Sequence, residues 1–173
     1  ERAVDRSDPE IAVPALKATW AVLERRGPFG TGLALAERVL GMSALEGKLR
    51  GQASQQAGEI HRLAGRAEDA GAHLGVAIET AAAHQDGLTE ALARSGLGSV
   101  YTVSGQGTDA RLHLETARAL FDRLGDPHGV AMVSANLGEL ELAQSRVAEA
   151  RAHLLEALGL FRDLGDRRSE GLV

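Results

Sequence analysis

The sequence predicts an all-α fold of stacked helix hairpins, on the strength of three observations. Three stretches of the chain repeat at a fixed offset of forty positions. The apolar content is almost entirely Ala, Leu and Val, because aromatic residues make up only 3% of the chain. Apolar residues also recur at spacings of three and four, as on the core-facing side of a helix. A repeat period in this range indicates a solenoid, in which each unit packs on its neighbours.

The repeat is visible at five positions that recur in all three copies. These are Gly58, Gly98 and Gly138; Ala70, Ala110 and Ala150; His73, His113 and His153; Ala77, Ala117 and Ala157; and Asp86, Asp126 and Asp166. The segments 120–126 and 160–166 match almost letter for letter, as LFDRLGD and LFRDLGD. A chain of this kind is built to present a surface, so its architecture is easier to read than its partner.

Composition and charge argue against several classes of function. The net charge of −5 comes from mixed Lys/Arg and Asp/Glu residues, with no basic stripe, which argues against direct nucleic-acid binding. No stretch reaches 18 uncharged apolar residues, so we expect no membrane span. The absence of cysteine excludes disulfides and thiolate metal sites and suits a reducing compartment. The start at Glu1 carries no signal-peptide pattern, and we expect a cytoplasmic protein.

Each 40-residue unit divides into two amphipathic helices. The expected helix pairs are 14–26 with 29–41, 46–64 with 66–84, 87–104 with 108–124, and 127–144 with 146–164. In these terms the chain has an N-terminal tail (1–13), a repeat array (14–166) with units at about 14–45, 46–85, 86–125 and 126–165, and the truncated start of a further repeat (166–173). Gly171 there occupies the place of Gly51, Ala91 and Ala131, so we expect a fragment of a longer array.

Turn chemistry separates the units. Gly125 is expected to take the left-handed conformation that ends a helix, Asp126 to cap the next helix, and Pro127 to lie in its first turn. The segment 164–166, Leu-Gly-Asp, repeats this arrangement. Turns this short make consecutive helices antiparallel neighbours.

The landmarks of each unit resemble the tetratricopeptide repeat. A Leu/Ala-Gly pair in the first helix ends at Gly58, Gly98 or Gly138, and the turn carries Gly65, Gly105 or Ser145. The second helix has the pattern Ala, then Leu four residues on, then Ala, as in Ala70, Leu74 and Ala77. The resemblance covers roughly 14–166 and implies a right-handed α–α superhelix of about four hairpins. The chain departs from the pattern in its period, 40 instead of about 34, and in having Leu-Gly-Asp where Pro commonly ends the second helix.

Repeats of this length look like those of bacterial multidomain regulators, such as the large ATP-binding transcriptional regulators of the LuxR type. In those proteins the repeats commonly act as a sensor or docking arm beside an ATPase module. Only that role carries over, because this chain holds no ATPase or DNA-binding motif.

The first repeat is degenerate. When Gly27 is aligned with the turn glycine of the other repeats, Trp20 falls where they have Gly, and Gly32 falls where they have Ala. We hypothesise that the large residue and the small residue have changed places across the contact between the two helices of the hairpin.

The sequence offers little support for catalysis or metal binding. Neighbouring units lie on the order of 10 Å apart, whereas Zn–N bonds are about 2 Å. One metal therefore cannot bind His73, His113 and His153 together, and we expect these residues to fill half-buried, aromatic-like places. The segment 96–101 resembles a kinase Gly-rich loop only superficially, since it lies in a predicted helix. We expect a non-enzyme without cofactor or metal.

The remaining candidate site is the concave groove that the first helices of the units line in this repeat class. The candidate residues are Gln52, Gln55, Gln56, Glu59 and Arg62; Leu92, Ser95, Ser99 and Thr102; and Met132, Asn136, Glu139 and Leu142. An amide-rich end that grades into an apolar one suits an extended peptide or a helix. Asn136 is the strongest single candidate, because related repeats often use this Asn to hold a peptide backbone. These residues are equally compatible with ordinary solvated helix surface.

The sequence thus favours a protein–protein interaction or sensor scaffold from a larger bacterial signalling or transcription regulator. Its expected partner is a protein or peptide, which includes another module of the same polypeptide, and not nucleic acid or membrane. Two alternatives stay open: a structural spacer or oligomerisation arm, and a small-molecule effector-sensing domain. The partner, the oligomeric state and the face of the coil that binds cannot be read from the sequence.

Overall fold

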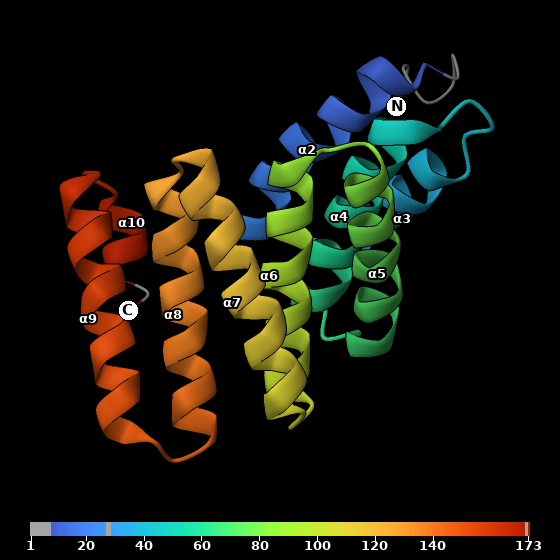
Figure 1. Ribbon diagram of the computed structural model, residues 1–173. Coiled ribbons are helices and arrows are strands. Elements are labelled where there is room, and N and C mark those ends of the chain that lie inside the picture. Colours follow the sequence, from blue (N-terminus) through green and yellow to red (C-terminus); the bar gives the residue numbers. More distant parts are fainter. Residues whose placement is uncertain (1–7, 27–28, 172) are drawn as a thin grey trace. The chain divides into compact units, whose positions relative to one another are not determined.

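The computed structural model describes residues 8–26, 29–171 and 173, and in these residues every regular element is a helix (Figure 1). The elements are α2 (Pro9–Arg26), α3 (Phe29–Leu40), α4 (Gly47–Leu63), α5 (Ala67–Ala83), α6 (Gly87–Val103), α7 (Gly107–Leu124), α8 (Pro127–Ala143), α9 (Val147–Asp163) and α10 (Arg167–Glu170). The chain divides into two compact units, Glu1–Gly96 and Leu97–Val173, and each is described by itself. Within each unit consecutive helices pack on one another, as in a helical repeat solenoid.

The observed helices match the sequence-based bounds to within one residue, with the exception of the first. Helix α2 begins at Pro9 instead of residue 14, so the expected tail is helical from Pro9 onward. Its start is capped by Asp8, whose Oδ1 accepts a hydrogen bond from Glu10 N at 3.1 Å. Proline suits a first helical position, whereas Pro14 lies inside the helix. The sequence-based prediction began the helix at Pro14, because proline commonly lies at a helix start, and therefore made the helix too short. Residues 1–7 of the expected tail lie outside the described residues.

The turn between α7 and α8 has the geometry that its sequence predicts. Gly125 adopts φ 65° in the left-handed region, Asp126 Oδ1 accepts from Gly129 N at 3.0 Å, and Pro127 occupies the first turn of α8. The second copy is also confirmed, because Gly165 has φ 69° and Asp166 Oδ1 accepts from Ser169 N at 3.2 Å. The same Gly-Asp turn therefore ends one helix and begins the next.

Left-handed residues mark the turns at every twentieth position from residue 65 to residue 165. They are Gly65, Gln85, Gly105, Gly125, Ser145 and Gly165, with φ between 53° and 74°. Four of the six are glycine, which adopts this conformation without steric cost. Gln85 and Ser145 adopt it with a side chain, which costs on the order of 1 kcal/mol.

We therefore expect Ser145→Gly to raise the free energy of unfolding by about 0.5–1 kcal/mol, because it removes the penalty of a Cβ at positive φ. Urea unfolding followed by circular dichroism measures the change. Ser104→Gly serves as the control, since Ser104 ends the corresponding helix of the preceding hairpin without a positive φ. An equal gain from both variants would contradict the interpretation.

The contact between the two helices of a hairpin, here called the seam, depends on glycine in each regular hairpin. In the first unit a Cβ placed on Gly58 of α4 would lie 2.6 Å from Leu74 Cγ of α5. In the second unit the same holds for Gly98 against Leu114 and for Gly138 against Leu154, each 2.6 Å from a leucine side-chain carbon. Leucine at the fourth place after the repeated alanine thus fills the space that glycine leaves open, as the resemblance implies.

The first hairpin inverts this arrangement. Trp20 of α2 is buried in a core with Leu16, Val39 and Ile60, and a Cβ on Gly32 of α3 would lie 2.7 Å from Trp20 Cζ3. The large residue now lies on the first helix and the glycine on the second. This geometry agrees with the swap that the aligned sequence suggests.

Gly32→Leu is expected to destabilise the chain by about 1–3 kcal/mol, because any side chain at this place displaces the indole ring of Trp20. Thermal or urea unfolding provides the test. Gly30→Ala in the same helix is the matched control, since a Cβ there meets no atom within 4 Å. An unchanged melting curve for Gly32→Leu would reject the swap.

Candidate functional site

A groove lies in the first unit between α2, α4 and α6, with a volume of about 350 Å³. Its lining combines aliphatic side chains, amides and charged groups that come from the three helices. The lining residues are Val13, Pro14 and Lys17 of α2; Lys48, Gln52, Gln55 and Gln56 of α4; and Asp86, Leu88, Thr89 and Leu92 at and within α6. These three helices are the first members of their hairpins, which is the position that the sequence predicts for a binding surface.

Asp86 organises one wall of the groove. This buried residue precedes α6 and accepts hydrogen bonds from Thr89 Oγ1 at 2.9 Å and from Gln52 Nε2 of α4 at 3.0 Å. Lys48 Nζ lies 3.6 Å from the same carboxylate. Burial alone would raise the pKa of Asp86, but the hydrogen bonds from Gln52 and Thr89 and the charge of Lys48 outweigh it and hold the pKa below its usual value. Asp86 is thus an ionised helix cap that also fixes Gln52.

Gln56 lies on the same wall of the groove. The residue as a whole is only 8% exposed, but its side chain lines the groove, and its amide is not a sealed group without a hydrogen-bond partner. Water bonds to an amide that reaches a groove until a ligand replaces that water. A ligand in the groove can therefore bond to Gln56 directly.

The remaining lining residues define what the groove can hold. Gln55 adds a second amide, Leu88 and Leu92 add aliphatic surface, and Lys17 adds an exposed cation. Amides both donate and accept hydrogen bonds, so they match the alternating donors and acceptors of a peptide backbone. No reacting group is arranged as a nucleophile with a base among these residues.

The structure brings together four of the predicted groove residues in the first unit, Gln52, Gln55, Gln56 and Leu92. The others of this unit lie elsewhere on the same helices. Glu59 and Arg62 form an ion pair one turn apart, with Arg62 Nε 2.8 Å from Glu59 Oε2, and Ser95 is buried. A role of any of these residues in binding stays a prediction.

The predicted residues of the second unit have varied environments. Thr102 Oγ1 donates to Gly98 O at 2.9 Å, and Met132 packs against Ala157 and Phe161. Ser99 and Asn136 are half-buried, and Glu139 and Leu142 are exposed. Leu142 lines a separate depression with α9. The binding role of these residues is likewise untested.

The contribution of α2 to the groove escapes the sequence-based prediction. The alignment that places Trp20 at Gly58 uses an offset of thirty-eight positions, and the same offset places Pro14 at Gln52 and Lys17 at Gln55. Extending that alignment back to Pro14 would have identified both. The degenerate first hairpin concealed them, because its offset differs from the forty positions of the other copies.

Two of the three repeated histidines, His73 and His113, fill aromatic-like places as expected, and His153 is half-buried. In the first unit half-buried His73 stacks on His61 with ring centroids 5.0 Å apart, and in the second unit His113 packs on Tyr101 at 5.5 Å. Burial, followed by the nearby His61, lowers the pKa of His73, and Asp69 and Glu37 oppose this shift. The described part of the chain contains no group of three or more His, Asp or Glu residues that could hold a metal ion.

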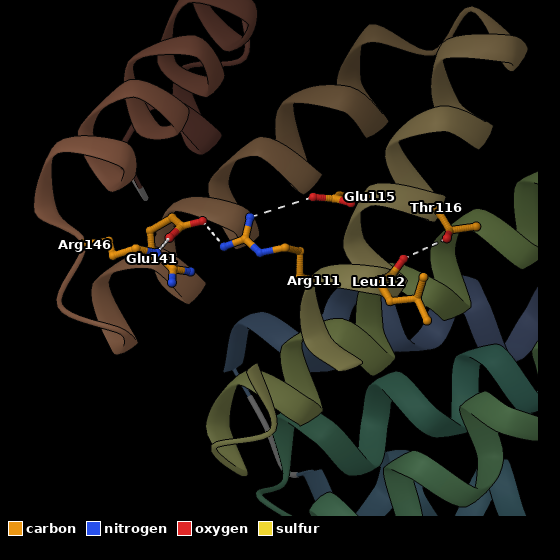
Figure 2. Close-up of polar contacts among 6 residues, drawn as sticks. All are labelled: Arg111, Leu112, Glu115, Thr116, Glu141 and Arg146. Atoms are coloured by element: carbon orange, nitrogen blue, oxygen red, sulfur yellow. Dashed lines mark hydrogen bonds and ion pairs between the residues drawn. The ribbon is translucent and has the colours of Figure 1, made fainter. Parts of the chain in front are cut away.

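The second unit contains a buried ion-pair cluster centred on Glu141 of α8, which is 2% exposed. Figure 2 shows its carboxylate between Arg111 of α7 and Arg146 of the following turn, both of which donate hydrogen bonds to it. Arg111 also lies 3.8 Å from Glu115. Burial would raise the pKa of Glu141, but the two arginines outweigh it and lower the pKa. Glu141 occupies the place of Tyr101 and His61 in the other repeats.

A second cluster joins the same helices. Arg118 of α7 donates two hydrogen bonds to Glu156 of α9, one of them 2.9 Å long, and Arg118 Nη1 lies 3.3 Å from Ser134 Oγ of α8. The Arg118 guanidinium lowers the pKa of Glu156, against a smaller opposing effect of burial. Arg111 and Arg118 of α7 thus each connect one hairpin to the next.

Glu141→Gln is expected to reduce the free energy of unfolding at pH 7 by about 1–3 kcal/mol, because it removes the charged partner of two arginines. The pKa of Glu141 is lowered by folding, so its contribution is complete above its unfolded pKa of about 4.3 and is lost as pH falls through the folded value. The difference between wild type and variant should therefore shrink between pH 7 and pH 3. Urea unfolding at several pH values measures it.

Exposed Glu139 of the same helix provides the control, and Glu139→Gln should leave stability unchanged at either pH. A difference for Glu141→Gln that is as large at pH 3 as at pH 7 would contradict a role of the charge.

The helical hairpins, closed at glycines and stacked on one another, define a helical repeat protein. Comparison with known families agrees, because residues 89–163 match a family model described as tetratricopeptide repeat. The match supports a tetratricopeptide repeat domain, a non-catalytic class that generally mediates protein–protein interaction or scaffolding. No curated protein matches the chain. Within the described residues, no helix combines the length and apolar character needed to cross a bilayer.

Proposed function

We propose that the chain is a non-enzymatic interaction segment of a larger cytoplasmic bacterial signalling or transcription regulator, and that the groove of the first unit binds an extended peptide. The amides of Gln55 and Gln56, which line a groove between the first helices of the hairpins, carry this proposal. The bound segment belongs to another protein or to another module of the same polypeptide. The length and turn sequence of the repeats support the regulatory context.

The chemistry of the groove supports a peptide as the ligand. Gln56 and Gln55 offer donors and acceptors to a backbone, and Leu88 and Leu92 offer an aliphatic surface to a side chain. Gln52 contributes less, because Asp86 already holds its amide. A spacer arm has no need of a groove lined by amides and aliphatic side chains, so this lining favours binding over a purely structural role.

Selection from a phage-displayed library of random dodecapeptides tests the proposal. We expect enriched peptides to bind the intact chain, and Gln56→Leu to weaken their binding about tenfold, since about 1.4 kcal/mol corresponds to a factor of ten. Fluorescence anisotropy with the synthesised peptides measures the dissociation constants. The same substitution should preserve stability, because Leu has a volume similar to that of Gln and suits a residue that is 8% exposed.

A loss of affinity at unchanged stability distinguishes a lost ligand contact from misfolding. Gln106→Leu is the matched control, because Gln106 is exposed in a turn of the other unit and should not affect affinity. Failure to enrich any peptide, or equal affinity of wild type and Gln56→Leu, would refute groove binding.

A further inference from the structure

The sequence contains lysine at two positions only, Lys17 and Lys48, and its other permanently positive side chains are arginines. Lys17 lies on α2 and Lys48 on α4, and both line the groove of the first unit. Among the described residues of this lining Asp86 is the one acidic group, so the lining carries a net positive charge. The chain as a whole has a net charge of −5. The charge of the groove is therefore suited to an acidic ligand.

The two lysines differ in their partners. Lys48 Nζ lies 3.6 Å from the carboxylate of Asp86, which buries its own charge in the wall of the groove with hydrogen bonds from Gln52 and Thr89. The charge of Lys48 is thus balanced within the wall. Lys17 is exposed, and it forms no ion pair with the described residues. Lys17 is therefore the cation of the groove that is open to a ligand.

Several arginines, in contrast, form ion pairs that hold the chain together. Arg94 pairs with Glu90 within α6, and Arg118 pairs with Glu156 between α7 and α9. A guanidinium is planar and holds a carboxylate in a fixed geometry, whereas the ammonium of lysine is a compact charge on a flexible stem. A lysine can therefore follow a carboxylate that arrives with a ligand. The placement of both lysines in the groove agrees with this use.

The backbone around Lys17 indicates which carboxylate it receives. Lys17 lies within α2, where the N–H groups of the backbone bond to carbonyl groups of the same helix. Capture of a chain terminus relies on a cluster of free backbone N–H groups, which the middle of a helix does not offer. A single flexible ammonium suits a single side-chain carboxylate. We therefore expect an Asp or Glu side chain of the ligand, and not its C-terminus, at Lys17.

The aliphatic part of the groove lies on its opposite side. Helix α4 packs on α2, and its Gln52 bonds to Asp86 at the start of α6, so α4 lies between the two. Leu88 and Leu92 of α6 follow one another by one helical turn and line the groove. Packed helices are about 8–10 Å apart, so an extended chain, which rises about 3.3 Å per residue, needs about five residues to pass from α2 to α6.

We propose that the groove selects peptides with an acidic side chain opposite Lys17 and, about five residues away, a large aliphatic side chain that packs on Leu88 and Leu92. Between these two anchors the amides of Gln55 and Gln56 bond to the backbone of the peptide. Selection of this kind rests on the proposed binding of an extended peptide in the groove, and it specifies which peptides bind.

The probes are the peptides enriched from the dodecapeptide library, synthesised with an acetylated N-terminus and an amidated C-terminus. We expect them to share an acidic residue, and its replacement by the corresponding amide should weaken binding about fivefold, as expected for an exposed ion pair. Lys17→Met should weaken binding of the acidic peptide by the same factor. The amide form should bind wild type and Lys17→Met equally, because the interaction is already lost. Fluorescence anisotropy measures all four dissociation constants.

Charge reversal sharpens the measurement. Lys17→Glu should weaken binding of the acidic peptide at least tenfold, and it should bind a peptide with Lys in place of the acidic residue more tightly than wild type does. Both effects should shrink in about 1 M salt, where the Debye length falls to about 3 Å. Arg50→Glu is the matched control, since Arg50 is an exposed cation of α4 outside the groove and its reversal should leave binding unchanged.

The aliphatic anchor has its own variant. Leu88 is 44% exposed, so Leu88→Ser should fold normally and weaken binding. Replacement of the aliphatic residue of the peptide by Ala should then cause no further loss in this variant, although it weakens binding to wild type.

The outcomes separate the two levels of inference. If no peptide is enriched, groove binding itself fails and the acidic anchor fails with it. Peptides whose binding depends on Gln56 but that lack an acidic residue, or that bind Lys17→Met as tightly as wild type, would overturn the acidic anchor alone. Binding only by peptides with a free C-terminus would also overturn it, because a terminal carboxylate would then occupy the place assigned to a side chain.

Discussion

The close approach of two helices at a glycine underlies the whole structure. Gly58 against Leu74 in the first unit, and Gly98 against Leu114 in the second, let each leucine enter a space that any Cβ would fill. The contact is made within a hairpin, between residues sixteen positions apart in the chain. It therefore closes each hairpin locally, and the outer sides of both helices remain for packing on the neighbours and for binding.

This local closure allows the repeats to differ in chemistry at equivalent places. One position near the end of the first helix holds His61, Tyr101 or Glu141, and all three side chains lie against the neighbouring helices. Two of them meet a histidine ring of the second helix, whereas Glu141 recruits two arginines. The same framework thus accommodates ring stacking and a buried ion pair.

Most of the fold could be predicted from the sequence because its determinants are local. Gly125, Asp126 and Pro127 set a turn by their own conformational preferences, and the repeat places Gln56 on the side of α4 that lines the groove. The start of α2 differs from its prediction because Pro14 mimics a helix boundary. The bond between Arg111 and Glu141 could not be predicted, since it depends on the register between two hairpins and not on either sequence alone.

The placement of left-handed residues at every twentieth position has a consequence for how such a chain can change in length. Addition or removal of a whole repeat keeps every turn, seam and cap in phase with its neighbours. A change of half a repeat also preserves the turns, but it exchanges the roles of first and second helices, so that glycine no longer faces its leucine. Duplication of entire hairpins is therefore the step that this backbone tolerates, and the surface can diversify afterwards, one helix face at a time.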